Sequence, residues 1–323
     1  MSSTAGGFQM TFMKRGRTLS RAVATAVIAA AMAATAGTAT AAEDPAGADR
    51  ARAEAEAQQR ARAPRLAGPR AAEPGQVATP TFAMTAVDKK DGNLYLYFPD
   101  RRGGFDPRYD VGVGFGFSAA VVSVDNDKDG YGDGTWNVHK DGLLSYTWSE
   151  GFEAHTKDIG KGWAVYNKVL SPGHLGGSQD ADLMAVDKSG VMWVYVGHAD
   201  GRVDQRVRIG GGWSQYTEIA GQGDLSGDGK ADVVARDTAG DLWLYKGTGD
   251  YRAPFEARAK VGAGWNTHNR VLSVGDLDAD GRTDIVARTK TGDLYRYSGT
   301  GDAIRPLGKP VKIGWGYNIY NLL

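Results

Sequence analysis

The chain repeats itself five times between about residue 79 and residue 323, and this repetition limits its possible folds more than any other feature. Two independent motifs keep the same spacing. The first is a short apolar segment that ends in tyrosine, and successive tyrosines are 49, 49, 50 and 52 residues apart: Tyr97, Tyr146, Tyr195, Tyr245 and Tyr297. The second is an Ile/Val-Gly-x-Gly-aromatic motif, with successive aromatic residues 48, 50, 52 and 52 residues apart: Phe115, Trp163, Trp213, Trp265 and Tyr317. Two motifs that stay in phase indicate one structural unit repeated along the chain.

Each repeat contains about four short strands separated by glycine turns. In the fourth copy we expect strands at residues 233–236, 242–246, 257–261 and 270–274. Four strands in a repeat of about 50 residues are typical of propeller blades, which must stack to bury their faces. The sequence therefore predicts an all-β fold, a five-bladed β-propeller of four-stranded blades over residues 79–323. The last copy stops short of its final strand, and we expect residues 76–83 to supply it and close the ring.

Composition supports this fold and excludes several functions. The chain has 46 glycines, 8 Trp and 14 Tyr, which favour short strands and tight turns. It has no cysteine, so disulfides, thiol catalysis and thiolate metal sites are excluded. Its 38 Lys+Arg balance its 38 Asp+Glu, which argues against a nucleic-acid binder, since such proteins need a basic face.

Residues 1–41 are predicted to be a secretory signal peptide. Four positive residues between positions 14 and 21 precede an Ala-rich stretch at 22–36, and Ala39-Thr40-Ala41 fits the small-x-small cleavage pattern. Met13 is an alternative start of the chain. The alternative to a signal peptide is an uncleaved membrane anchor, although the apolar stretch is short for a membrane span. Cleavage leaves a mature chain with net charge −4 and no membrane span. We expect a secreted, extracellular monomer.

Residues 42–78 are rich in Ala, Arg, Glu and Pro and have no aromatic residue. A segment of this composition has almost no large apolar side chain to bury. We therefore predict a disordered linker between the signal peptide and the propeller.

Three acidic loops, which we expect to lie between repeats, follow the pattern Asp-x-Asp/Ser-x-Asp-Gly-x-x-Asp at residues 125–133, 224–232 and 276–284. Oxygen ligands at positions 1, 3, 5 and 9, with the carbonyl of position 7, suit a hard cation such as Ca²⁺. We therefore expect about three calcium sites with a structural role. The predicted ligands are Asp125, Asp127, Asp129, Tyr131, Asp133, Asp224, Ser226, Asp228, Lys230, Asp232, Asp276, Asp278, Asp280, Arg282 and Asp284. The alternative is an ordinary Asp/Gly turn without metal.

The third repeat has a counterpart loop at residues 174–182, and it keeps only the last carboxylate in register, Asp182. We expect no metal there.

These loops, with the Asp-Val-Val-Ala-Arg and Asp-Ile-Val-Ala-Arg segments that complete the second and third, resemble the FG-GAP/VCBS repeats also found in integrin alpha chains. The resemblance implies a secreted or surface-exposed propeller with calcium in its loops. Integrin propellers have seven longer blades, whereas this chain has five shorter ones. The short period and the Gly-x-Gly-Trp-x-x-Tyr element resemble five-bladed tachylectin propellers, which are lectins for N-acetylated amino sugars.

The sequence shows no catalytic constellation, so we expect no enzyme activity. The five histidines fall in different positions along the repeats, and His268 stands where other copies have tyrosine, which favours a packing role. Sugar binding is the sharper hypothesis, because exposed aromatic rings stack on sugar faces. The candidate ligand-binding residues are Phe115, Trp163, Trp213, Trp265 and Tyr317. The alternative is that these rings wedge between blades.

The expected function is that of a secreted, calcium-stabilised, lectin-like module that recognises carbohydrate at a cell wall or on environmental glycans. Its expected partner is a glycan or a cell-surface protein. A protein-interaction scaffold is one alternative, and a targeting module whose enzyme is a separate chain is another.

Overall fold

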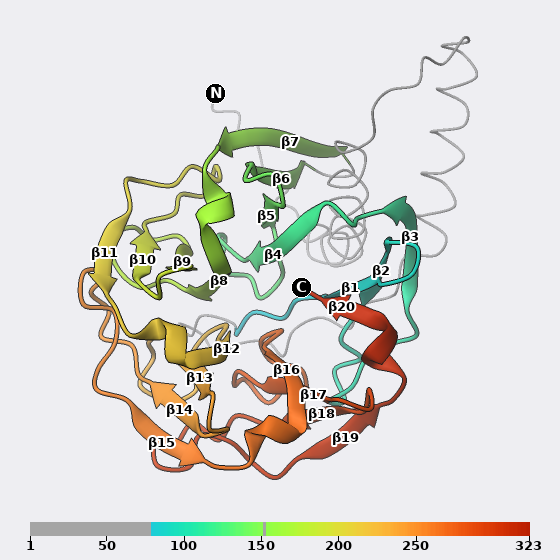
Figure 1. Cartoon of the computed structure of the whole chain (residues 1–323), viewed down its shortest axis with the longest axis vertical. Helices are drawn as coiled ribbons and strands as arrows, with labels where there is room; N and C mark the ends of the chain where they lie inside the picture. Colours follow the sequence, from blue (N-terminus) through green and yellow to red (C-terminus); the bar gives the residue numbers. More distant parts are fainter. Residues whose placement is uncertain (1–78, 151–152) are drawn as a thin grey trace, which may run out of the picture.

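The structure is a computed structural model that describes residues 79–150 and 153–323. It shows five four-stranded antiparallel sheets arranged as the blades of a ring (Figure 1). The predicted all-β, five-bladed propeller is therefore confirmed. The predicted signal peptide at 1–41 and linker at 42–78 lie outside the described residues. Within those residues, no helix has the length and hydrophobicity needed to cross a bilayer.

Blades 2 to 5 each use four consecutive strands, and the first strand of each lies nearest the ring centre. Blade 2 contains β4 (Ser118–Val124), β5 (Gly134–His139), β6 (Leu144–Glu150) and β7 (Glu153–Gly160). Blade 3 contains β8 (Tyr166–Gly173), β9 (Asp182–Asp187), β10 (Met192–Tyr195) and β11 (Val207–Gly210). Blade 4 contains β12 (Tyr216–Ala220), β13 (Val233–Asp237), β14 (Leu242–Tyr245) and β15 (Ala259–Gly262). Blade 5 contains β16 (His268–Leu272), β17 (Ile285–Thr289), β18 (Leu294–Tyr297) and β19 (Val311–Gly314).

Blade 1 closes the ring with strands from both ends of the described chain. Its order is β20-β1-β2-β3, with β20 (Tyr320–Leu322), β1 (Met84–Asp88), β2 (Asn93–Tyr97) and β3 (Tyr109–Gly114). Strand β20 pairs antiparallel with β1, so that Leu322 lies opposite Ala86. The expected closure is therefore present, but the supplier of the missing strand is corrected. The C-terminal segment adds the innermost strand, and residues 79–83 form no strand.

The boundary between blades also differs from the boundary between sequence repeats. The strand expected at 270–274 as the last of the fourth repeat is β16, and it pairs with β17 as the first strand of blade 5. The Gly-x-Gly-aromatic motif consequently spans the junction between blades. Four of these junctions contain a short 3-10 helix: η1 (Trp163–Val165), η2 (Trp213–Gln215), η3 (Trp265–Thr267) and η4 (Tyr317–Ile319).

The tyrosines of the sequence repeat occupy one common register in blades 3 to 5, but the tyrosine of blade 2 does not share it. Tyr195, Tyr245 and Tyr297 occupy the same register in blades 3 to 5, opposite Leu183, Val233 and Ile285. In blade 2 that register is held by Thr147, which lies opposite Thr135. Tyr146 lies one position earlier, opposite Trp136, and is buried.

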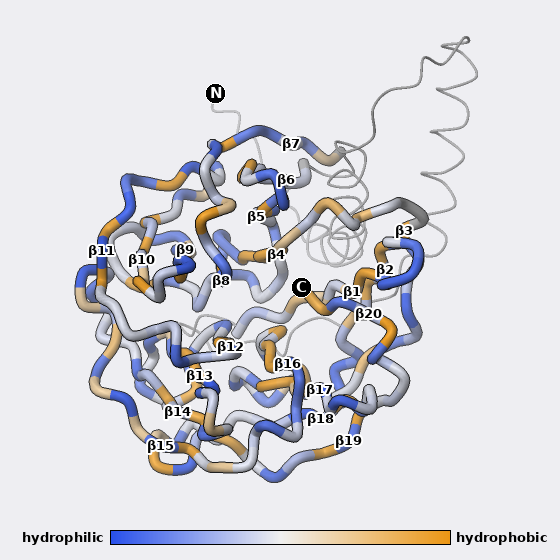
Figure 2. The backbone as a smooth tube through the Cα atoms, viewed as in Figure 1, coloured by the Kyte–Doolittle hydropathy of each residue, from blue (hydrophilic) through white to orange (hydrophobic). Residues whose placement is uncertain are grey.

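The buried side chains form clusters within and between neighbouring blades, and Figure 2 shows hydrophobic segments along the strands and hydrophilic ones along many of the outer turns. Residues 79–83, here called the strap, cross the middle of the ring before β1 begins (Figure 1). The strap is the one described segment that runs across the ring opening, and it brings distant loops together.

Candidate functional site

The three acidic loops lie within blades rather than between repeats. Each joins the innermost strand of its blade to the second strand, and we call them loop 2 (125–133), loop 4 (224–232) and loop 5 (276–284) after their blades. All three leave their sheets on the same side of the ring, because every innermost strand runs in the same direction through its blade. The loop expected to lack metal, loop 3 (174–182), occupies the same place in blade 3.

The first aspartate of each acidic loop folds the loop around itself. Asp125 accepts hydrogen bonds from the backbone N–H of Asp129 at 3.2 Å and of Gly130 at 2.8 Å. Asp276 accepts the equivalent bonds from Asp280 at 3.1 Å and Gly281 at 2.9 Å. These bonds hold the later carboxylates of the loop close to the first one.

In loops 3, 4 and 5 the last aspartate fastens the loop to the end of the third strand of its blade, whereas Asp133 of loop 2 accepts hydrogen bonds from the backbone N–H groups of Asn126 and Asp127 within the loop. Asp284 accepts hydrogen bonds from the backbone N–H of Leu277 at 3.0 Å and of Gly299 at 2.9 Å. Asp182 makes the same pair of bonds in loop 3, with Leu175 and Gly197 at 2.7 and 2.9 Å. The position-9 carboxylate therefore has a structural task even in the loop where no metal is expected.

Carboxylates converge in two of the three predicted cation loops. One ligand oxygen from each of Asp125, Asp127 and Asp133 lies within 4.8 Å of the others, and the same holds for the trio Asp276, Asp278 and Asp284. Among the described residues, the carboxylates of loop 4 form no such group. Its Asp228 lies 4.0 Å from the ammonium of Lys246, and the third position is Ser226.

The electrostatics of loops 2 and 5 favour a bound cation. Burial raises the pKa of Asp125 to about 8, with Asp133 and Asp129 adding negative charge nearby. Burial likewise raises the pKa of Asp284 to about 7, and the negative charge of Asp278 adds to this. Grouped, desolvated carboxylates repel one another, and a hard divalent cation turns that repulsion into attraction. The residues present thus fit calcium at these two loops.

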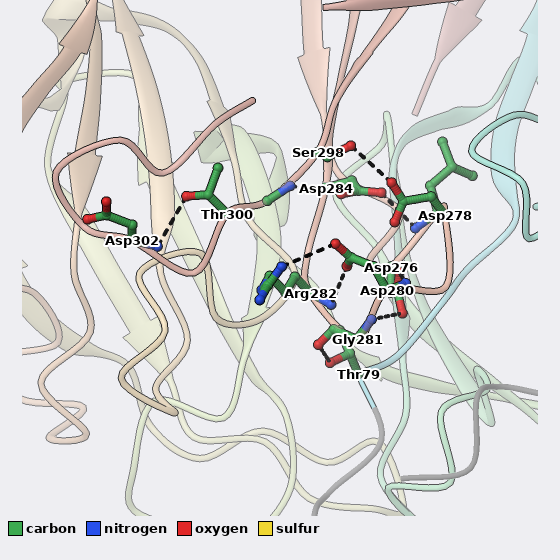
Figure 3. Close-up of polar contacts among 12 residues, drawn as sticks. Thr79, Asp276, Asp278, Asp280, Gly281, Arg282, Asp284, Ser298, Thr300 and Asp302 are labelled. Carbon is green, nitrogen blue, oxygen red and sulfur yellow. Dashed lines mark hydrogen bonds and ion pairs between the residues drawn. The ribbon is translucent and has the colours of Figure 1, made fainter. Parts of the chain in front are cut away.

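An arginine of strand β18, Arg296, contacts loop 5, and sequence reasoning missed it. The guanidinium of Arg296 lies 3.0 Å from Asp278, and both side chains are largely buried. Figure 3 shows Asp278 and Asp284 on one side of the loop, with Asp276, Asp280 and Arg282 close by. The sequence contained a signal for this contact, because Arg296 occupies the strand position that the apolar residue Leu244 occupies in blade 4. A tethered cation at this place partly neutralises loop 5.

The strap joins the two loops whose carboxylates converge. The backbone N–H of Thr81 donates to Gly130 of loop 2 at 3.1 Å, and its hydroxyl donates to the carbonyl of Asp276 in loop 5 at 2.9 Å. The Thr79 hydroxyl donates to Gly281 of loop 5 at 2.6 Å. Gly275 is required here, because a Cβ on it would lie 1.8 Å from the carbonyl oxygen of Pro80.

The predicted sugar-stacking aromatics lie inside the blade junctions. Phe115 is fully buried, and Trp163, Trp213, Trp265 and Tyr317 are at most 8% exposed. Trp163 stacks on Tyr195 of the next blade with ring centroids 4.7 Å apart, and Trp265 packs on Tyr297 at 4.6 Å. The structure thus places these rings between neighbouring blades, as the alternative of a packing role predicted, with their faces covered by protein.

Comparison with known proteins supports part of the sequence resemblance. Residues 224–287, which run from loop 4 to strand β17, match the family model for an FG-GAP-like repeat. The resemblance to FG-GAP repeats is thereby confirmed for this part of the chain. The search of curated proteins gave no match.

Several solved propellers are loosely similar to this chain. AofleA from Arthrobotrys oligospora is 12% identical with a TM-score of 0.44, covering 76% of this chain and 75% of its own. A six-bladed fucose-recognising lectin from Aleuria aurantia is 16% identical with a TM-score of 0.39, covering 74% and 80%. BP39L lectin from Burkholderia pseudomallei is 15% identical with a TM-score of 0.42, covering 74% and 71%. At such values the function has to be inferred from the residues of this chain.

Proposed function

We propose that this chain is a secreted, non-enzymatic glycan-binding propeller whose blades are stabilised by calcium. The calcium part is supported by the two converging carboxylate groups in loops 2 and 5. Calcium bound there would screen the carboxylates and fix the ends of the innermost strands. A role in shaping the ring fits these positions better than a role in chemistry, because the loops are held by their own backbone hydrogen bonds.

The observation that carries the glycan part is a set of exposed polar side chains at one register of the innermost strands. Asn167, Thr217, Asn269 and Asn321 follow Tyr166, Tyr216, His268 and Tyr320 respectively, and all four are exposed. Asn167 and Thr217 line the cavity at the ring centre, and Asn321 lines the cavity beside it. Amide and hydroxyl groups presented in this way suit the hydroxyl groups of a sugar.

The test is a glycan array probed with the purified protein, in calcium and again with chelator. We expect selective binding to a group of glycans, and weaker binding together with a lower Tm when calcium is removed. The test variant is Asn321→Ala at the ring centre. Its matched control is Asn266→Ala, because Asn266 is exposed at a blade junction. Loss of binding in the first and not the second supports the proposal, whereas no binding to any glycan contradicts it.

An apolar surface favours a second candidate function, a protein-interaction scaffold. Trp315 is 79% exposed between two glycines of the last Gly-x-Gly motif, where other repeats have Lys161 or Ala263. Val311 and Ile319 from the same junction are each about half exposed, at 48% and 47%. Exposed apolar side chains grouped in this way are more frequent at protein contacts than on free surfaces. Capture of a discrete protein complex that Trp315→Ser abolishes would favour this function.

A further inference from the structure

The ring centre contains two adjoining polar cavities. One has a volume of about 260 Å³ and is lined by the innermost strands β4, β8, β12 and β16, together with the segment from Phe82 into β1. The other has a volume of about 460 Å³ and shares Ala119, Arg270 and Leu323 with the first. Together they reach the size of small-molecule sites, about 300–1,000 Å³. The strap and a hydrogen bond of 2.9 Å from Gln222 to Ser123 cross the side that carries the acidic loops.

The charges that line these cavities are strongly unbalanced. Four cationic side chains line them, namely Lys140, Lys168, Arg270 and Arg288. Among the described residues that line them, Glu218 is the only acidic one. A chain with equal numbers of positive and negative residues has thus gathered a positive cluster at one place. Low-dielectric walls strengthen the attraction of such a cluster for an anion.

The single carboxylate does not satisfy the cations around it. Glu218 accepts hydrogen bonds from Arg270 at 3.2 Å and from the backbone N–H of Val271 at 3.1 Å. The Nε of Arg270 is buried and has no hydrogen-bond partner. Lys168 is half-buried, and its burial lowers the pKa of its ammonium even though Glu218 opposes this. An additional anion near Arg270 would relieve both costs.

The residues next to these charges are suited to hydroxyl groups. Each of Lys168, Glu218 and Arg270 is preceded by one of the exposed polar residues Asn167, Thr217 and Asn269. A ligand in these cavities therefore has both cationic side chains and amide or hydroxyl groups among its lining residues. A sugar that carries a carboxylate offers both partners in one molecule.

We propose that the ring centre binds the carboxylate-bearing residue of an acidic glycan, with Arg270 and Lys140 contacting the carboxylate and Asn167 contacting hydroxyl groups. This inference rests on the proposed glycan-binding function and names its ligand class. It places the site at the ring centre instead of at the buried aromatics of the blade junctions. The neutral charge of the whole chain makes a nucleic acid a poor occupant, because such ligands need an extended basic surface.

The test measures binding of sodium glucuronate, glucose and inorganic phosphate to the full chain by calorimetry. We expect glucuronate to bind at least tenfold more tightly than either glucose or phosphate. Lys140→Gln and Arg270→Gln should each weaken glucuronate binding about tenfold. Lys312→Gln serves as the matched control, because Lys312 pairs with Asp293 on the blade surface, at 2.8 Å. Lys140 is exposed and donates to the carbonyl of Gly116, so its variant should fold normally.

Several results would overturn the inference. Equal binding of phosphate and glucuronate would indicate a general anion site without sugar recognition. Unchanged glucuronate binding in both the Lys140 and the Arg270 variants would place the ligand elsewhere. Array binding to neutral glycans alone would contradict the acidic ligand and leave the proposed function standing, whereas no glycan binding of any kind would contradict both.

Discussion

At the scale of single residues, one register of the innermost strands shows how side chains connect the first strand of a blade to the third strand of the same blade. Tyrosine occupies it in blades 1, 3 and 4, and the hydroxyl groups of Tyr166 and Tyr216 each lie 2.6 Å from a tyrosine hydroxyl of the same blade, on Tyr195 and Tyr245. In blade 5 the register holds His268, whose ring nitrogen lies 3.3 Å from the hydroxyl of Tyr297. The packing role expected for His268 from its sequence position agrees with its burial.

His268 gives the fold a pH dependence that a tyrosine would not. Burial lowers its pKa below 6.5, and the positive charge of Arg236 adds to this. Below about pH 6.5 the unfolded chain therefore takes up a proton that the folded chain resists, so stability falls as the pH drops toward the folded pKa. We predict that His268→Tyr removes this loss, by on the order of 1 kcal/mol at pH 5 relative to pH 7.5. Urea denaturation of both chains at the two pH values measures it.

Chelator present in every sample removes any contribution from calcium, and the loop carboxylates titrate equally in both chains. Parallel changes in stability between pH 7.5 and pH 5 in wild type and variant would contradict the prediction.

At the scale of elements, the sequence predicted the strands more accurately than the register between them. Alternation and glycine turns located β13 and β14 to within about one residue, because both signals are local. The register of β6 was missed because Leu143 and Leu144 are adjacent apolar residues, and either fits the repeat. Likewise, the loop pattern identified all three acidic loops, but whether their carboxylates converge depends on contacts with distant segments such as the strap.

The acidic loops should respond unequally to calcium. At millimolar calcium and a Kd of about 10⁻⁴–10⁻³ M, each occupied site stabilises the fold by about 0.4–1.4 kcal/mol. We predict that Asp276→Asn removes most of one site's contribution, whereas Asp224→Asn, the same change in loop 4, has a smaller effect. The calcium-induced rise in Tm measured for each chain decides this, and equal losses in the two variants would contradict it.

The stabilisation by calcium should also increase with pH. The pKa of Asp125 is raised to about 8 and that of Asp284 to about 7, so below these values the folded chain retains protons that calcium must displace. Without calcium, the raised pKa values favour folding at low pH and cost stability as the pH rises through them. The rise in Tm on adding calcium should accordingly be larger at pH 8 than at pH 5.5.

At the scale of the whole molecule, periodicity predicted the number of blades but not where a blade begins. A repeating pattern fits equally well with any starting strand, so sequence alone could not show that β16 opens blade 5. The same ambiguity concealed which end of the described chain provides the closing strand. The ring resolves it through β20, which places the buried side chains of Tyr320 and Leu322 in one cluster with side chains of β1, β2 and blade 5.

This closure predicts that the last four residues are essential to the ring. Deleting residues 320–323 removes the pairing of Leu322 with Ala86 and of Tyr320 with Asp88, and it exposes β1 as a new sheet edge. Exposed edges pair with other chains, so we expect a much lower Tm and the appearance of oligomers in gel filtration. The matched control is Val311→Ser in the outermost strand β19, which alters a half-exposed side chain and leaves the closure intact. A deletion variant that stayed monomeric and kept its Tm would show that blades 2 to 5 hold the ring without β20.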